Sequence, residues 1–252
     1  QKNLPIVPIT DLTIKDNSLI VATQGRSIWM LDDLTVIHQL SSSVDEEKLY
    51  KPKDSYRMRG AGGRKSLTAG TNLPNGVIIH YFLPSFDKES DEVKLSIHSK
   101  DGSLIKEFSN KSKENLMKVK KGGNSFVWNM KYSGAKRLDK MVLWGADFSG
   151  AKAVPGNYIV KLKVNEKELT QDFIIHKDPT SEGSIEDIKA QFEFVNEING
   201  VVNEAHNAIE NIRKIKKDLT KFQSDYADNE SAKNLIDESK LILESIDLIE
   251  NE

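Results

Sequence analysis

Few residues of this sequence combine the type and the spacing that chemistry requires. The five histidines are scattered, and we identify no metal-ligand motif among them. The sequence contains no cysteine, which excludes disulfides and thiol catalysis. No G-x-S-x-G elbow of a serine hydrolase occurs either. We therefore predict neither a cofactor nor a metal site in this chain.

Paired carboxylates are the remaining chemical possibility. A glycosidase needs two of them, roughly 5 to 10 Å apart, on either side of the scissile sugar bond. The best candidates are Asp32, Asp33 and Asp147, although 38 acidic residues will produce some close pair by chance. Aspartates at the ends of strands more often shape turns through side-chain hydrogen bonds. We therefore expect no catalytic residue here, and a small hydrolytic site at these three aspartates is the alternative.

Aromatic residues offer a second possible function, the stacking of sugar rings. Trp128 stands on an alternating apolar stretch, which is typical of a core residue. If the β-rich region is a carbohydrate-binding module, the candidate stacking residues are Tyr81, Tyr132 and Trp144.

The first forty residues predict three short strands. Apolar runs at 11–14, 19–22 and 28–31 are separated by the turn-forming pairs Asp16-Asn17 and Gln24-Gly25. Such a meander is too small to bury both of its faces by itself, and its edges invite pairing. It needs neighbours.

The next 140 residues divide into a linker and a sandwich. Residues 41–70 are polar and irregular, and their RMRGAGGRKS stretch lacks the full phosphate-loop pattern. Residues 71–179 alternate between apolar and polar positions in several short segments, with turn signals at Asp101-Gly102 and Pro155-Gly156. We expect a two-sheet, immunoglobulin-like β-sandwich there.

The last part of the chain has a helical period. Residues 180–252 carry apolar side chains at three- and four-residue steps, with a cap at Ser184 and Asp187 and a break near 225–229. This predicts an antiparallel helical hairpin, whose apolar stripe must face the sandwich or further helices of a longer native chain. Gly200 predicts a kink or a close helix contact.

Charge and hydropathy predict neither nucleic-acid binding nor a membrane-spanning segment. The chain has 36 basic and 38 acidic residues, so its overall charge gives no reason to expect nucleic acid. No apolar run approaches the roughly 18 residues of a membrane-spanning segment.

Several stretches resemble one protein family. They are LPIVPITDLTIKDNSLIVATQGRSIWMLDDLTVIHQL, GTNLPNGVIIHYFL, GGNSFVWNMKY, AVPGNYIVKL and FIIHKDP, in this order between residues 2 and 180. They are similar to the carboxy-terminal region of large bacterial sortilin-like glycosyl hydrolases with BNR-type repeats, which are sialidase-like proteins. The VATQGRSIWMLDD and NLPNG segments are the most specific of them.

The resemblance implies a β-propeller before the sandwich, with the helices last. We therefore expect a mainly β plus α chain: a remnant propeller-blade meander at 1–40, the linker, the sandwich and a truncated hairpin. Hydrolytic residues of the family would lie in the propeller, so none is assigned to this chain. The implied function is a non-catalytic brace or interaction module. Its expected partners are the rest of the propeller and a glycan or protein, and its expected location is the periplasm or the cell surface.

Overall fold

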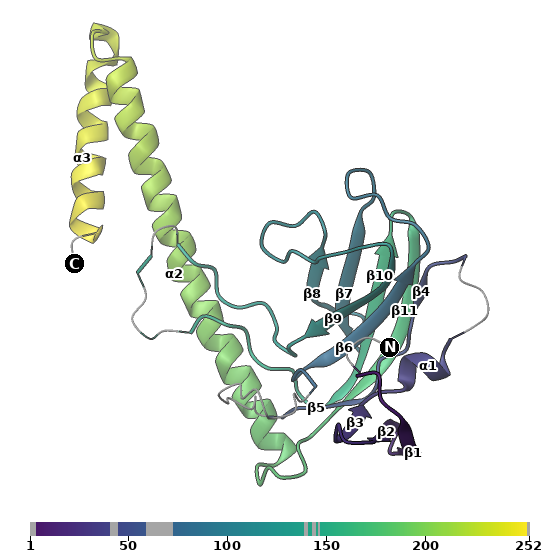
Figure 1. Ribbon diagram of the computed structural model, residues 1–252. Helices are drawn as coiled ribbons and strands as arrows, with labels where there is room; N and C mark the ends of the chain where they lie inside the picture. Colours follow the sequence, from purple (N-terminus) through teal and green to yellow (C-terminus); the bar gives the residue numbers. More distant parts are fainter. Residues whose placement is uncertain are drawn as a thin grey trace. The chain divides into compact units, whose positions relative to one another are not determined.

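The computed structural model describes residues 4–40, 45–58, 73–138, 141–142, 145 and 147–250 of the 252-residue chain. They form two compact units, which are considered separately below. The first comprises residues 1–133 and 152–192, and the second 134–151 and 193–252. β-strands come first along the chain and helices last (Figure 1). The described residues of 134–151, which the sequence assigns to the sandwich, thus fall in the same unit as most of the carboxy-terminal helices.

The first unit begins with the predicted meander. Strands β1 (Ile9–Lys15), β2 (Ser18–Thr23) and β3 (Ile28–Leu31) form an antiparallel sheet in the order β1-β2-β3. Asp16 and Asn17 both have positive φ between the paired Lys15 and Ser18, as a tight two-residue hairpin requires. The second turn uses Gly25 at a φ of 75°. A short helix, α1 (Thr35–His38), follows.

Two further sheets share the main core of this unit. The five-stranded sheet has the order β5-β11-β10-β7-β8, and the three-stranded sheet has the order β4-β6-β9. All neighbours are antiparallel except β5, which runs parallel to β11. The strands are β4 (Lys48–Leu49), β5 (Ser55–Tyr56), β6 (Val77–Leu83), β7 (Val93–Ser99), β8 (Leu104–Ser109), β9 (Gly122–Trp128), β10 (Gly156–Val164) and β11 (Lys167–His176).

Period-two alternation explains this core. Every second residue of β6 and β7 is buried, and in β10 the same holds from Tyr158 to Val164. Trp128 is fully buried among them, with edge-on contacts to Tyr158 and Phe173, which confirms its prediction as a core residue. Strands β4 and β5 lie in the stretch 41–70, which therefore is not wholly irregular.

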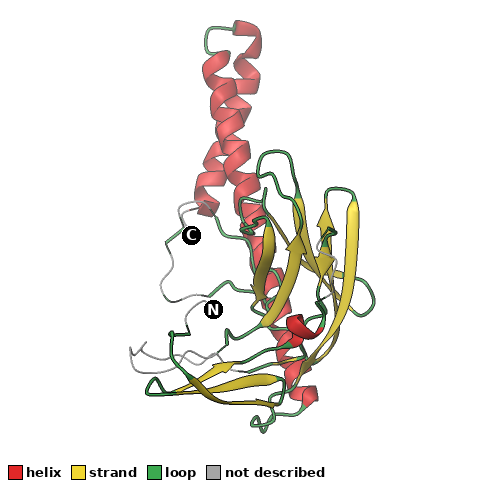
Figure 2. Ribbon diagram, turned by 45° about the vertical axis from the view of Figure 1, so that its right-hand side comes forward, coloured by secondary structure: helices red, strands yellow, loops and turns green. Residues whose placement is uncertain are grey.

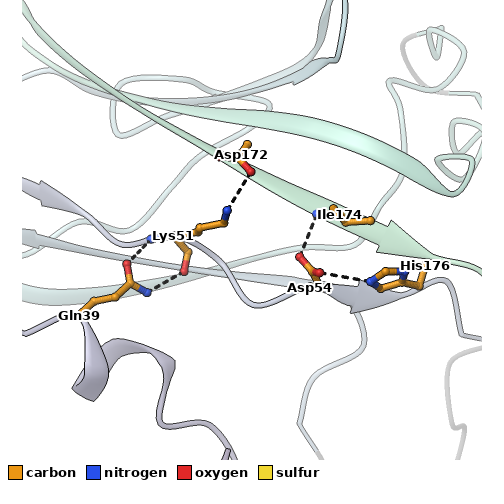
Figure 3. A network of polar contacts seen from close by, with 6 residues as sticks. All are labelled: Gln39, Lys51, Asp54, Asp172, Ile174 and His176. Atoms are coloured by element: carbon orange, nitrogen blue, oxygen red, sulfur yellow. Dashed lines mark hydrogen bonds and ion pairs between the residues drawn. The ribbon is translucent and has the colours of Figure 1, made fainter.

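A chain of polar contacts holds residues 45–58 in place (Figure 3). The Gln39 amide donates to the Lys51 carbonyl at 3.0 Å and accepts from the Lys51 amide at 2.8 Å. Lys51 Nζ pairs with Asp172 at 2.9 Å on β11. The Asp54 carboxylate accepts from the Ile174 amide and lies 3.2 Å from His176 Nε2. These contacts fix the segment beside β11, on the edge where β5 pairs with it.

The helices behave largely as their sequence predicts. Helix α2 spans Ile185–Asp225, and the short 3-10 turn η1 (Glu230–Ala232) leads into α3 (Lys233–Glu250). The Ser184 hydroxyl accepts from the Asp187 amide, while the Asp187 carboxylate accepts from the Ser184 amide. This is the predicted reciprocal cap. A Cβ at Gly200 would meet nothing within 4 Å, so this glycine marks no close helix contact.

The second unit joins the two helices and an irregular strap (described residues of 134–151). α3 runs antiparallel to the end of α2, since Gln223 bonds Ser239 and Lys216 pairs with Asp247 (Figure 1). The strap lies on an earlier part of α2. Its Lys136 amide donates to Asn203, and its Phe148 ring packs edge-on against His206.

The chain as a whole is therefore β followed by α. It has several antiparallel sheets, one of them curled like half of a barrel, and two contacting helices at the carboxy-terminal end (Figure 2).

Candidate functional site

The strand register of the meander places apolar side chains on both of its faces. Leu12 pairs with Val21, which pairs in turn with Trp29. Successive residues of a strand point to opposite faces, so one face collects six apolar residues, with the polar Thr23 at the end of β2. They are Leu12, Ile14, Leu19, Val21, Trp29 and Leu31.

The opposite face is apolar along β2 and β3 and polar along β1. Ile20 pairs with Met30, and Ala22 pairs with Ile28. The neighbouring strand β1 adds the polar residues Asp11, Thr13 and Lys15 to this face. A sheet that packs one face on a core and turns the other to water normally alternates apolar with polar residues. The middle and last strands of the meander do not.

Much of this apolar surface is exposed. Ile14 is 64% exposed on the first face, and Ile28 is 71% exposed on the second. Val21, at the centre of the middle strand, is buried. Exposed apolar surface on both sides of a sheet marks an interaction surface, and free edge strands add unpaired backbone groups to it. The meander is therefore the strongest candidate for a functional surface in the first unit.

Hydrogen bonds to nearby residues give two of the three candidate aspartates a structural role. Asp33 accepts from the Thr35 amide at 2.9 Å, at the start of α1, and from the Asn17 side chain at 3.2 Å. Asp147 accepts from both the amide and the hydroxyl of Ser149. The backbone carbonyl of Asp32 accepts from Ser18. Asp33 and Asp147 therefore shape turns, and Asp32 and Asp33 lie in a different unit from Asp147.

The two predicted sugar-stacking residues that the structure describes are buried in whole or in part. The expectation that Tyr81 is exposed is wrong, because it points into the core with 1% of its surface accessible. Tyr132 is partly buried, and Phe192 lies edge-on to its ring at 4.8 Å between centroids. Trp144 lies outside the described residues. Tyr81 occupies an inward position of β6, which alternation alone could have shown.

A cleft in the first unit brings together acidic and apolar residues. Its volume is about 410 Å³, and its wall includes Asp33, Asp54, Tyr56 and Ile78. This volume is within the range of small-molecule sites. Both carboxylates already accept hydrogen bonds, Asp33 from the Thr35 amide and Asp54 from the Ile174 amide. No local sequence pattern singles out Asp54, because only the pairing of β5 with β11 brings it to the cleft.

A second hollow contains His80. Its volume is about 660 Å³, and it lies between α1 and strands β6 and β9. Burial lowers the pKa of His80, and the charge of Asp33 opposes this shift. Ser125 is its cross-strand neighbour. In the part of the chain that the structure describes, no hydrogen bond joins these two side chains, as a nucleophile and its base would require.

One further pair has the spacing of a metal-binding motif. His206 and Glu210 lie one helical turn apart on α2, a spacing that the sequence analysis overlooked. The His206 Nδ1 atom donates to the Lys136 carbonyl, and Glu210 pairs with the Lys136 ammonium group. Both side chains therefore anchor the strap. No group of three or more metal-ligating side chains occurs among the described residues.

Comparisons with known proteins add no assignment. No protein-family model matches the sequence, and no curated protein matches it. None of the described helices is long and apolar enough to cross a membrane.

Proposed function

We propose that this chain is a non-catalytic, structural region of a larger protein, and that its meander forms part of a β-propeller blade. The observation that carries this proposal is the exposed apolar surface on both faces of the meander. In a propeller, blades stand side by side around a ring, so each blade is covered on two faces by its neighbours. Such an environment requires a sheet that is apolar on both sides.

Under this proposal, the remainder of the chain supports the propeller. Two sheets with one shared core suit an immunoglobulin-like sandwich that packs by itself. The sequence resemblance to sortilin-like, BNR-repeat glycosyl hydrolases supports the same order of propeller, sandwich and helices. Under this proposal, any hydrolytic site lies in the propeller, and the protein is exported to the periplasm or the cell surface. The propeller and a glycan or protein ligand are its partners.

The test compares one substitution in two contexts. Ile28→Lys changes a side chain that is 71% exposed in this chain, so it should alter the free energy of unfolding by less than about 0.5 kcal/mol. In the parent protein with its propeller, the same lysine would be buried without a partner. It should then destabilise the propeller by about 2 kcal/mol or more. Urea unfolding measures both effects.

A matched control separates burial from general damage. Lys15→Ile, at the end of β1, should be tolerated in both contexts because it buries no charge. Equal, small effects of Ile28→Lys with and without the propeller would refute the proposed docking. Cleavage of sialosides or other glycosides by the purified chain would refute the non-catalytic assignment.

A further inference from the structure

Two neighbouring cationic side chains of the first unit lack a carboxylate partner. Arg57 follows β5, and its backbone amide donates to the His176 carbonyl at 2.8 Å. Lys152 forms an isolated antiparallel bridge with Lys131. Neither Arg57 nor Lys152 forms an ion pair with a carboxylate in the part of the chain that the structure describes.

Neutral groups hold both side chains in place. Arg57 Nε donates to the Ala153 carbonyl at 3.0 Å, and Arg57 Nη2 donates to the Gln191 side chain at 3.2 Å. The Lys152 ammonium group donates to the Met58 carbonyl. The two segments thus exchange side-chain bonds, because Arg57 reaches the residue after Lys152 and Lys152 reaches the residue after Arg57. This exchange brings the two positive charges close together.

The charges of Arg57 and Lys152 repel each other where both side chains are partly buried. Burial lowers the pKa of Lys152, and the charges of Arg57 and Lys131 lower it further, while Asp178 opposes the shift. Burial also lowers the pKa of Arg57. Charged groups that are removed from water normally have a partner of opposite charge. A negatively charged group beside Arg57 would therefore relieve an unfavourable arrangement.

A hollow with a volume of about 700 Å³ opens at Arg57 and Met58, which is within the range of small-molecule sites. The Arg57 guanidinium carries more N–H donors than its two bonds use, and its planar fork matches the two oxygens of a carboxylate. Gln191 also lines the hollow. Its side-chain oxygen accepts from Arg57, so its amide nitrogen remains a donor for a ligand.

Three carboxylates on the wall of the same hollow limit the charge of a ligand. They are Asp178, Glu182 and Asp187. Asp178 and Asp187 accept hydrogen bonds from residues near them in the sequence, Asp178 from Thr180 and Asp187 from Ser184. Their negative charges would repel a ligand that carries several negative groups. The hollow therefore suits a ligand with one negative group, placed at the Arg57 end.

We propose that this hollow is a binding site for a small molecule with a single carboxylate group, which pairs with the Arg57 guanidinium. Two parallel N–H···O bonds from Arg57 would hold the carboxylate, and Lys152 would add a second positive charge nearby. All of these residues belong to the first unit. The site is independent of the role proposed for the meander.

Thermal unfolding of the whole chain tests the site with acetate as the probe and chloride at the same ionic strength as the reference. A ligand that binds only the folded chain stabilises it, so saturating acetate should raise the Tm by about 2 °C or more. Arg57→Gln and Lys152→Gln should each lose most of this rise. Lys163→Gln removes an exposed cation of β10 and should keep the rise, which separates binding from general effects of the salt.

Lys152→Gln is the decisive variant, because Arg57→Gln also removes two structural hydrogen bonds. Its circular dichroism spectrum without acetate should match that of the unchanged chain. Malonate, which carries two carboxylates, should raise the Tm less than acetate does. No response of the unchanged chain to acetate would overturn the proposal. An equal response of Lys152→Gln, or a stronger response to malonate than to acetate, would overturn it too.

Discussion

The meander and the two-sheet core of the first unit are made from similar strands with opposite outcomes. Ile79 on β6 is fully buried, whereas Ile28 on β3 is 71% exposed. Both are isoleucines within paired strands. The difference lies in what each sheet faces: β6 shares a core with strands of a second sheet, while most apolar side chains of β1 and β3 are exposed. Strand formation and strand burial are therefore separate properties of this sequence.

Replacing each of the two isoleucines with alanine tests whether the two sheets differ in burial. Ile79→Ala should lower the free energy of unfolding by about 2 to 5 kcal/mol, because it leaves a cavity in a packed core. Ile28→Ala should change it by less than about 0.5 kcal/mol, since its side chain is mostly in water. Urea denaturation followed by far-UV circular dichroism measures both. Similar losses in the two variants would show that the meander is covered in solution.

A matched pair of glycines tests the backbone in the same two regions. Gly76 has a φ of 147°, and a Cβ there would lie 2.4 Å from the Trp128 carbonyl oxygen. Gly76→Ala should therefore destabilise the core by about 2 kcal/mol or more. Gly25, in the meander, has a φ of 75° and open space around it, so Gly25→Ala should lose only about 1 kcal/mol. Thermal melts of both variants measure the two losses of stability. A larger loss for Gly25→Ala than for Gly76→Ala would contradict the prediction.

The pH dependence of unfolding tests whether the Tyr81 hydroxyl is buried in the core. Burial raises the pKa of Tyr81 to about 12 from its usual 10. Between these values the unfolded chain ionises Tyr81 and the folded chain does not. The stabilisation is thus complete below pH 10 and is lost as the pH rises towards 12, by on the order of 2 kcal/mol. Burial also raises the pKa of Tyr158, which adds to the effect.

Urea titrations at pH 8 and pH 11 test this prediction. Tyr81→Phe should lose less stability between the two pH values than the unchanged chain does. Tyr226→Phe, at an exposed position on the helical unit, serves as the control and should behave like the unchanged chain. An identical pH response of the two variants would show that the Tyr81 ring is accessible to water.

The smallest expected effect concerns the local bonds of the meander. The Asn17 side chain donates to Thr35 Oγ1 at 2.9 Å and to Asp33 at 3.2 Å, which ties the first hairpin to α1. Asn17→Gly removes these bonds but tolerates the φ of 63°. It should cost about 1 kcal/mol. Hydrogen exchange should quicken in β1 and β2 and stay unchanged in β6. Faster exchange in β6 would show that the two sheets unfold together.

The sequence determined much of the local structure. Alternation at Val93, Leu95 and Ile97 predicted a strand with one buried face, and all three are fully buried. The reciprocal cap at Ser184 and Asp187 and the break after Asp225 are also as predicted. These features depend on neighbouring residues in the chain, whose geometry is fixed by the backbone. Their prediction therefore needed no knowledge of distant contacts.

Which faces of the strands and helices are buried depends on the tertiary structure. The sequence offered Tyr81 as an exposed ring, and packing between two sheets buried it. It treated residues 134–151 as part of a sandwich, and contacts with Asn203 and His206 placed the strap on α2. It gave no reason to single out Asp54, which reaches β11 only through the parallel pairing of β5. Burial depends on contacts between residues far apart in the chain, and periodicity cannot specify which faces meet.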